Sequence, residues 1–360
     1  MTQFVANAAV LALARESRGL TQAEVARAMS DLAGEAVSQA FVSKAEAGRL
    51  AVSGDRLGLY AAALCYPVEV LCTDPEVHGV GIGLVYHRRK ASLGAKALRR
   101  VHAELMFTRS QLRALQVAIG STPNRFHRVE RGPMDIPAEI AQHVRKEWDL
   151  PPGPIDVLVA AVEAAGGLVI ARDLDADGLD AVTQWTGDEP PLFLINLKAP
   201  TDRFRFSLAH EIGHVFLHGG VGGGQEIEQE ADEFASELLL PADELRGSFT
   251  GSVDLQRLIE LKRYWGASMV ALVRRAVTLG ALSDWQYRQL MIEMSALGYR
   301  TREPAELPRE RPRLVRHLAQ QLVVSTGSTE AAAALVGVLP DEFHDLYLSP
   351  GGDADPIELS

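Results

Sequence analysis

One short run constrains the fold of this chain more than any other feature: FSLAHEIGHVFLH, at residues 206–218. It places His210 and His214 at positions i and i+4, and apolar residues surround both. Residues four apart on an α-helix lie one turn apart on the same face, so both imidazoles can reach a single ion. The run therefore predicts a helix over about 202–217 that packs on a core and carries a metal site.

Glu211 gives this motif a chemical use. It is rotated by about 100° from His210 around the helix, so it lies beside a shared ion and not on it. A carboxylate there can take a proton from water that zinc activates, because zinc lowers the pKa of its water and polarises a carbonyl group. A purely structural metal site has no use for such a base, which argues against a metal-stabilised scaffold. The motif predicts a zinc-dependent hydrolase that cuts peptide bonds.

A second acidic helix follows the motif, with the sequence EIEQEADEFASELLLP at 226–241. Catalytic zinc usually has three protein ligands and a water. Glu228 and Asp232 lie one turn apart on this helix. We expect Glu228 to be the third ligand and Asp232 to orient a ligand histidine through its other ring nitrogen. Glu230 is the competing third ligand, and the simpler alternative is that these carboxylates only face solvent.

His218 extends the histidine face by another turn, about 6 Å further along the helix. That distance is too long for it to share an ion with His210 and His214. Two roles stay open for His218: a packing residue near the helix end, or a catalytic hydrogen-bond donor to the transition state.

The rest of the chain predicts an α+β fold that is mainly helical. Three short apolar segments before the motif predict a small β-sheet: LVIARDL, LDAVTQW and PLFLINL. We divide the chain into a helical module, a basic helical linker, a core with the metal motif, a helical C-terminal region and a disordered tail. Their ranges are 1–75, 76–131, 132–245, 246–348 and 349–360.

Charge is distributed unevenly along the chain, whose net charge is −11. Residues 1–75 hold 6 basic and 8 acidic side chains, whereas residues 76–131 hold 11 and 3. The basic segment favours a local anionic partner, and a solvated linker is the alternative. No apolar run has the roughly 18 residues that a membrane span needs, and no signal peptide is apparent. Two cysteines fit a reducing compartment, so we expect a cytoplasmic protein without a membrane partner.

The run LFLINLKAPTDRFRFSLAHEIGHVFLH, the acidic helix and the later LKRYWGASMVALVRRAVTLGALSD together resemble the ImmA/IrrE family of zinc metallopeptidases. The resemblance covers about 137–310. It implies a zincin-like peptidase core, zinc ligands at His210, His214 and Glu228, and a general base at Glu211. It also implies a protein substrate, because family members cut or inactivate transcriptional repressors. We expect the strand that ends near Asn196 to be a peptide-docking edge.

The segments ARESRGLTQAEVARAMS and VSQAFVSKAEAG resemble helix-turn-helix modules of the XRE/Cro type, which implies a five-helix domain that binds double-stranded DNA. Gln22 would begin the positioning helix. The residues expected at the DNA are Gln22, Ser38, Gln39, Ala40, Lys44 and Arg49. The turn between the two helices is longer than usual and the module is slightly acidic. The basic residues Arg88, Arg89, Lys90, Lys96, Arg99 and Arg100 could supply the missing charge. A module that docks another protein is the alternative.

Together these features predict a zinc endopeptidase that cuts a protein substrate and is tethered to DNA by its helix-turn-helix module. The family resemblance implies that this substrate is a transcriptional repressor. The alternative function is a DNA-binding regulator whose peptidase-like domain senses a ligand or metal without turnover. Apolar stripes in the C-terminal helices suit a core or the seam of a homodimer.

Overall fold

The computed structural model of the 360-residue chain describes residues 4–74, 84–87, 94–120, 124–130, 132, 136–176, 178–187, 189–218, 224–251 and 253–349. For residues 84–87 it describes the backbone. Two sequence-based expectations therefore lie outside the described residues. They are the basic residues 88–90 and the predicted tail beyond residue 349.

Five helices fold residues 8–71 around an apolar core, which confirms the predicted helical module. They are α1 (Ala8–Ser17), α2 (Gln22–Ala33), α3 (Gln39–Glu46), α4 (Gly54–Leu64) and α5 (Val68–Leu71). A capping box starts α2, because the side chains of Thr21 and Glu24 each accept the other's backbone N–H. Gly34 ends α2 with a φ of 68°, a left-handed conformation that favours glycine.

A four-stranded sheet in the order β1-β3-β4-β2 forms the centre of the molecule. Its strands are β1 (Leu84–His87), β2 (Leu168–Arg172), β3 (Ala181–Trp185) and β4 (Leu192–Asn196). β2 pairs in parallel with β4, and β3 pairs antiparallel with both β4 and β1. The three predicted strands are confirmed, and β1 is an addition. The expectation that the strand ending at Asn196 is a free docking edge is wrong, because β4 is hydrogen-bonded on both sides.

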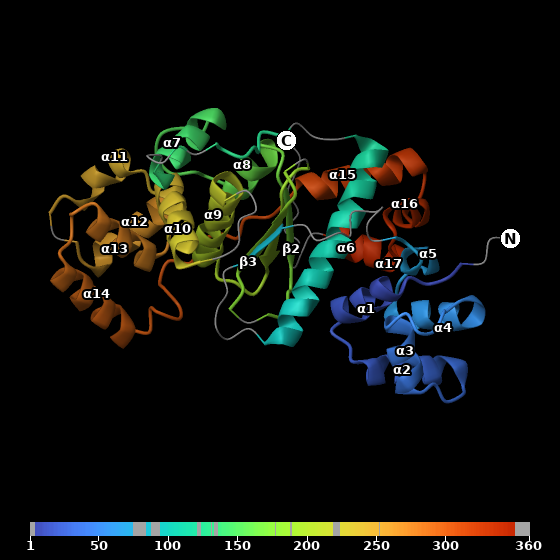
Figure 1. Ribbon diagram of the computed structural model, residues 1–360. Helices are drawn as coiled ribbons and strands as arrows, with labels where there is room; N and C mark the ends of the chain where they lie inside the picture. The colour runs from blue at the N-terminus through green and yellow to red at the C-terminus, as the bar shows by residue number, and fades with distance from the viewer. Residues whose placement is uncertain are drawn as a thin grey trace.

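Helices cover both faces of this sheet, as Figure 1 shows. α9 (Thr201–His218), which carries the metal motif, contacts β3 and β4 on one face and packs against α10 (Gln225–Leu239). α10 in turn packs on α7 (Pro137–Glu147), and α8 (Leu158–Ala164) leads into β2. Alternate strand residues serve the two cores: Phe193 joins the α9 side, and Leu192 and Leu194 join the opposite side.

The opposite face is covered by α6 (Ala95–Ile119) and by the last helices of the chain. α6 is one long helix with buried Leu105, Leu112 and Leu115, although the sequence placed it in a basic linker. α15 (Leu314–Thr326) and α16 (Thr329–Val336) pack against it. α17 (Pro340–Phe343) and the π-helical turn η2 (His344–Leu348) complete this layer.

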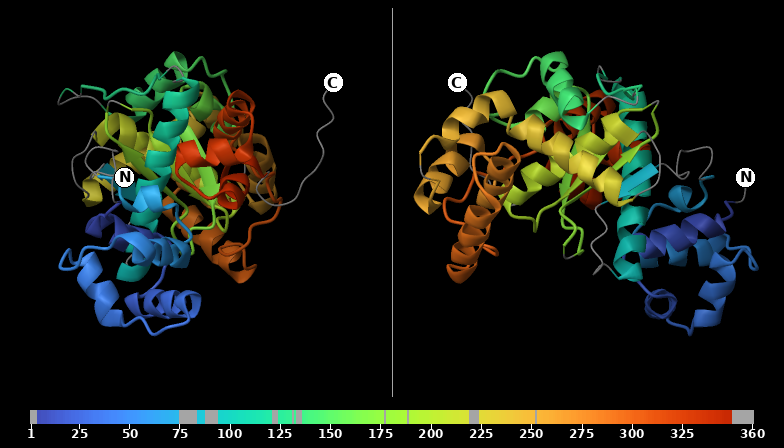
Figure 2. Two further views of the ribbon diagram at one scale, coloured as in Figure 1. Left: turned by 90° about the vertical axis from the view of Figure 1, so that its right-hand side faces the viewer. Right: turned by 60° about the vertical axis from the view of Figure 1, so that its left-hand side comes forward.

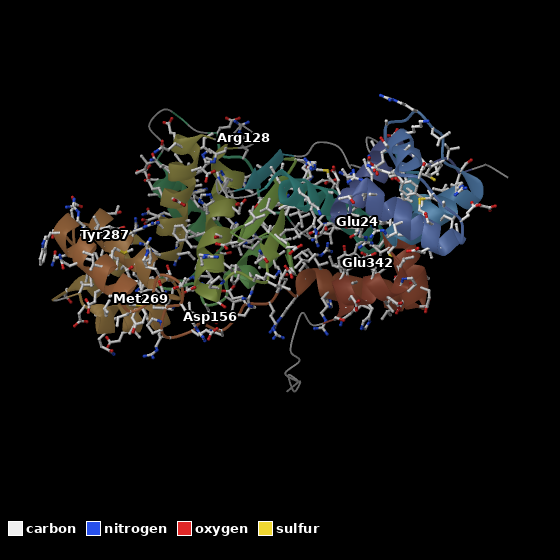
Figure 3. All side chains as sticks on the ribbon, turned by 90° about the horizontal axis from the view of Figure 1, so that it is seen from below. Glu24, Arg128, Asp156, Met269, Tyr287 and Glu342 are labelled. Carbon is white, nitrogen blue, oxygen red and sulfur yellow. The ribbon has the colours of Figure 1, made fainter. Side chains whose placement is uncertain are left out.

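The helical C-terminal region is present, but it occupies two separate places. α11 (Ala242–Leu245), the short η1 (Arg246–Phe249), α12 (Leu255–Trp265), α13 (Met269–Thr278) and α14 (Asp284–Ala296) continue the core around α9 and α10. α15–α17 lie at the other end of the molecule. Figure 3 shows Met269 of α13 and Glu342 of α17 on opposite sides of the sheet.

The helix-turn-helix region docks on this body along α6, as both views in Figure 2 show. Arg18 forms a bidentate ion pair with Glu342, with distances of 2.6 and 2.9 Å. Tyr66 packs against Phe107 of α6, with ring centroids 4.7 Å apart and the rings tilted by 30°. Arg99 lies 3.4 Å from Glu16. Within the described residues, no helix is both long and apolar enough to cross a membrane.

Candidate metal centre

α9 brings the predicted histidines and glutamate into the buried interior. The helix is enclosed by the sheet on one side and by α10 on the other, so His210, Glu211 and His214 are each at most 2% exposed. Buried imidazoles and carboxylates are costly unless they have partners. The arrangement therefore calls for partners on neighbouring elements, and α10 supplies them.

Three donor groups converge between α9 and α10. The Nε2 atoms of His210 and His214 lie 3.0 Å apart, and the Glu228 carboxylate oxygens lie 3.4 and 3.5 Å from them. These are the only described residues that form a group of three metal-binding side chains. Tetrahedral zinc with bonds of about 2.0–2.1 Å separates its ligand atoms by about 3.3 Å. The observed distances therefore fit zinc without rearrangement of the helices.

Asp232 lies one turn after Glu228 and contacts the other side of His210. Its Oδ1 is 2.8 Å from His210 Nδ1. An imidazole that donates a proton from Nδ1 presents the lone pair of Nε2 to a metal. The predicted role of Asp232 as an orienting residue thus has the required geometry.

Glu230, the competing third ligand, points elsewhere. Its Oε2 lies 2.9 Å from Nε2 of His218, and Nδ1 of His218 lies 3.0 Å from Nδ1 of His214. His218 is therefore on the side of the His214 ring that is remote from the converging Nε2 atoms. This position suits a residue that holds His214 in place more than one that touches a substrate.

Glu211 lies beside the three donor groups and is 1% exposed. Its Oε2 has no hydrogen-bond partner among the described residues. Burial raises the pKa of Glu211 to about 8, against the opposing charge of His210. A small cavity of about 80 Å³ adjoins it, lined by His210, Phe206 and Asp180 among others. A buried carboxylate that faces such a cavity can accept a proton from a molecule bound there.

The carboxylates of α10 control the charge of the histidines. Burial lowers the pKa of His210, but Asp232 and Glu228 more than offset this effect and its pKa lies at about 9. Burial lowers the pKa of His214. Hydrogen bonds with both histidines lower the pKa of Glu228. The cluster thus holds a proton at His210, in the position where a metal cation would replace it.

A glycine allows α10 to approach this closely. A Cβ added at Gly213 would lie 3.1 and 3.2 Å from Phe234 side-chain atoms and 3.3 Å from the Ala231 Cα. Contacts of this length are tighter than ordinary van der Waals packing. Gly213 therefore sets the distance between the helix with the histidines and the helix with Glu228.

Buried cations fix the two ends of this assembly. Arg205 of α9 donates to the Ile155 carbonyl at 2.6 Å and pairs with Glu310. Arg275 pairs with Glu237 of α10 and donates to the Leu240 carbonyl. These partners lie 35 to 105 residues away, so sequence spacing could not reveal them. The same holds for His218 and Glu230, which face each other across the loop between α9 and α10.

The residues predicted at DNA lie on a different part of the molecule. Gln22 starts α2, but its side-chain amide donates to Glu46 at 3.0 Å. Ser38 caps α3 by accepting the N–H of Phe41. Gln39, Ala40, Lys44 and Arg49 are exposed on or just after α3. Ser43, which was not among the residues predicted at DNA, is exposed one turn after Gln39 on the same face.

The basic segment offers less free charge than its composition indicates. Arg100 pairs with Asp175 at 2.7 Å and with Glu104 at 2.9 Å, and Arg99 pairs with Glu16 of the helix-turn-helix region. Lys96 is exposed at the start of α6. Of the basic residues expected to supply charge to DNA, three lie in the described part, and two of them, Arg99 and Arg100, thus form ion pairs within the chain.

Comparison with known families supports both halves of this description. Residues 162–277 match the family model of peptidase family M78, described as the IrrE N-terminal-like domain. Residues 11–71 match a helix-turn-helix family model. Comparison with curated proteins gives no match. The first matched region contains the complete histidine and carboxylate cluster, and the second contains α2 and α3. The chain thus combines a region similar to a metallopeptidase family with a DNA-binding type of helix-turn-helix, as the sequence resemblance indicated.

Proposed function

We propose that the chain is a zinc-dependent endopeptidase that cuts a protein substrate, a transcriptional repressor, and that its helix-turn-helix region tethers it to double-stranded DNA. One observation carries this proposal. The donor atoms of His210, His214 and Glu228 converge within 3.5 Å of one another, with the buried carboxylate of Glu211 beside them. A site that only stabilises the fold would not need that fourth group.

Each residue has a defined task in this proposal. His210, His214 and Glu228 hold the ion, and Asp232 keeps His210 oriented. Zinc, when bound, supplies a Lewis acid that polarises the scissile carbonyl and makes water acidic near neutral pH. Glu211 accepts the proton of the attacking water and passes it to the leaving amine. Its burial keeps that proton from bulk solvent.

The first experiment measures metal content per chain by mass spectrometry on protein purified without added metal. We expect close to one zinc in the wild type and much less in His214→Ala and in Glu228→Gln. Glu226→Gln is the matched control, because Glu226 is an exposed carboxylate on the same helix. A folded wild type without zinc would reject the enzyme and favour the DNA-binding regulator.

The second experiment tests catalysis directly. Incubation with candidate repressors should give fragments with the wild type and none with Glu211→Gln. Identical fragments from both proteins would mean that the cleavage comes from elsewhere.

The proposal assigns DNA binding to residues 1–75, with Gln22, Ser38, Gln39, Lys44 and Arg49 as contacts, and catalysis to residues 132–245. The charge of the DNA-binding module is too low to make strong phosphate binding evident from sequence alone. DNase footprinting on DNA upstream of its own coding sequence tests this part. A homodimer also stays a prediction, which sedimentation analysis can decide.

A second function is favoured by the contact between the two regions. Arg18 and Glu342, and Tyr66 and Phe107, join the helix-turn-helix region directly to the body that carries the metal centre. Such a contact can couple metal occupancy to DNA affinity without any proteolysis. This sensor function predicts that zinc changes the footprint and that Glu211→Gln behaves like the wild type.

A further inference from the structure

A cavity of about 940 Å³ lies beside the metal centre, between the start of α9, the helices α12–α14 and the segment 299–309. It is much larger than the cavity at Glu211. Its walls come from the peptidase region and from the helical region that follows it. Neither the metal site nor the DNA-binding region uses it.

The lining of this cavity is strongly basic in a chain with a net charge of −11. Seven basic side chains line it and only three acidic ones. Lys262, the buried member, is neutralised by Asp202 and Glu303, whose oxygens lie 2.5 and 2.9 Å from its Nζ. The other cations are on the exposed rim: Lys198, Arg203, Arg274, Arg300, Arg302 and Arg309.

Lys198 and Arg203 already pair with Asp173 and Asp180, at 3.1 and 2.7 Å. Arg274 and Arg300 have no acidic partner within the described part of the chain. Arg302 has only a 3.7 Å pair with Glu306, and both of those side chains are more than 80% exposed. An exposed pair of this kind contributes little. The rim therefore carries positive charge that an anionic ligand can use.

The floor of the same cavity is apolar. Phe206, Val270, Met291 and Tyr299 line it and are partly buried against the core around α9. The ligand that matches both surfaces has apolar side chains for the floor and carboxylates for the rim.

The cavity adjoins the small cavity at the candidate active site. Arg203 and Phe206 line both the large cavity and the small one that contains His210 and Glu211. Phe206 and Arg203 precede His210 by four and seven residues, which is about 6 and 10 Å along the helix axis. An extended peptide covers about 10 Å with three residues. A chain that enters from the large cavity thus reaches Glu211 within a few residues.

We propose that this cavity binds an acidic segment of the protein substrate, with apolar side chains on the floor and carboxylates on the arginine rim, a few residues from the bond that is cut. This inference rests on the proposed peptidase function. The rim cations come from separate elements and are spread over a long surface. Lys262, the only buried basic side chain in the lining of the cavity, already pairs with two carboxylates. A compact anion would therefore find no enclosed cluster, whereas an extended peptide can meet Arg274, Arg300 and Arg302 one after another.

The experiment measures binding and not cleavage, with full-length Glu211→Gln protein and a fluorescein-labelled peptide that repeats Leu-Glu-Asp. Fluorescence anisotropy should show saturable binding at low salt that weakens as salt is raised. The matching Leu-Gln-Asn peptide should bind about tenfold more weakly than the acidic peptide. The acidic peptide should also bind about tenfold more weakly to Glu211→Gln protein that carries Arg274→Glu and Arg300→Glu as well. Both arginines are exposed and form no ion pair with a described residue, so folding should be retained, which circular dichroism checks. The single change Arg300→Gln gives a milder second variant.

Arg288→Glu is the matched control, because Arg288 is an exposed arginine of α14 that does not line the cavity. It should change the affinity less than about twofold. Equal binding of the acidic and uncharged peptides, or no effect of the double reversal, would overturn the proposal. Inorganic tripolyphosphate that binds more tightly than the peptide and displaces it would also overturn it, since the cavity would then be a small-anion site. Absence of zinc or of proteolysis in the wild type would reject the peptidase and leave this binding result unchanged, so the two failures are distinguishable.

Discussion

The metal centre and the DNA-binding face present their predicted residues in opposite ways. At the metal centre, His210, His214 and Glu211 are buried, and the ring nitrogens of the two histidines lie 2.8–3.5 Å from neighbouring polar atoms. On α3, Gln39 and Lys44 point to solvent. The metal site is assembled within the chain, whereas the DNA-binding face needs DNA to give its side chains partners.

This difference decides what each substitution should change. A residue in the metal centre is part of a packed network, so its replacement affects metal binding, catalysis or stability. A residue on α3 contributes to no such network, so its replacement should change DNA affinity alone. A substitution in one region should therefore leave the function of the other region unchanged.

The largest effect is expected for Glu211→Gln. General bases contribute on the order of 10²- to 10⁴-fold to rate, so cleavage of an identified substrate should fall by about that factor. Zinc content and DNA affinity should stay at wild-type values, because Glu211 is neither a ligand nor near α3. Rate, metal content and footprint are measured on the same preparation. Glu233→Gln, an exposed carboxylate of α10, is the control. A loss of zinc in Glu211→Gln would contradict the assignment of Glu211 as a base.

The next largest effect is the pH dependence of zinc binding. Zinc must displace the proton of His210, whose pKa in the metal-free chain is raised to about 9. Below that pH the protonated form dominates, so zinc affinity should fall about tenfold for each pH unit from 9 down to 6. Residues 4–74 contain no histidine, so DNA affinity should stay nearly flat over the same range. Chelator competition and anisotropy measure the two affinities. A zinc affinity that does not change with pH below pH 8 would contradict the prediction that zinc displaces one proton from His210.

A smaller effect is expected from the residues behind His214. His218→Gln and Glu230→Gln should each weaken zinc binding about 10- to 100-fold, because they remove the contact that orients the ligand ring. Zinc affinity is measured with a competing chelator, and the visible spectrum of the cobalt-substituted protein reports the ligand geometry. Unchanged affinity combined with lost cleavage would instead favour the alternative role of His218 as a hydrogen-bond donor in the reaction.

Packing between α9 and α10 gives a fourth prediction. Gly213→Val should lower the free energy of unfolding by about 1–3 kcal/mol, because the new side chain must displace Phe234 and the backbone at Ala231. Denaturant unfolding measures the change. Gly247→Val is the control, since a Cβ at Gly247 meets nothing within 4 Å. A stability change at Gly213 no larger than at Gly247 would show that the helices can separate without cost.

The same contrast explains how much the sequence could predict. Helices α9 and α10 and three strands follow from local patterns, and the donor groups follow from the i, i+4 spacing within each helix. Tertiary packing brings the two helices together, and only this packing decides whether Glu228 or Glu230 faces the two histidines. Helical periodicity limits which residues share a face, but it does not say which face meets α9.

The error over β4 has a physical reason that the sequence did contain. LFLIN is apolar on both faces, which is typical of a strand buried on both sides and so of a central position. An edge strand would show alternation or charge. By contrast, no local signal could reveal β1, a strand of four residues that pairs with the distant β3. In this pairing Tyr86 lies opposite Thr183, which is 97 residues later in the chain. The cavity with the basic rim was also hidden, because its cations are scattered from Lys198 to Arg309.

The smallest expected effect belongs to the exposed face of α3. Lys44→Gln should weaken binding to an operator fragment only several-fold at moderate salt, and it should lower the slope of log affinity against log salt by about 1 if Lys44 meets a phosphate. Zinc content, cleavage and unfolding should not change, because the side chain packs on nothing that supports the metal centre. Lys146→Gln is the control, an exposed lysine of α7 far from α3. An unchanged slope of log affinity against log salt would show that Lys44 does not contact a phosphate. A change in zinc content would show that the docking contact between Arg18 and Glu342 couples the two regions after all.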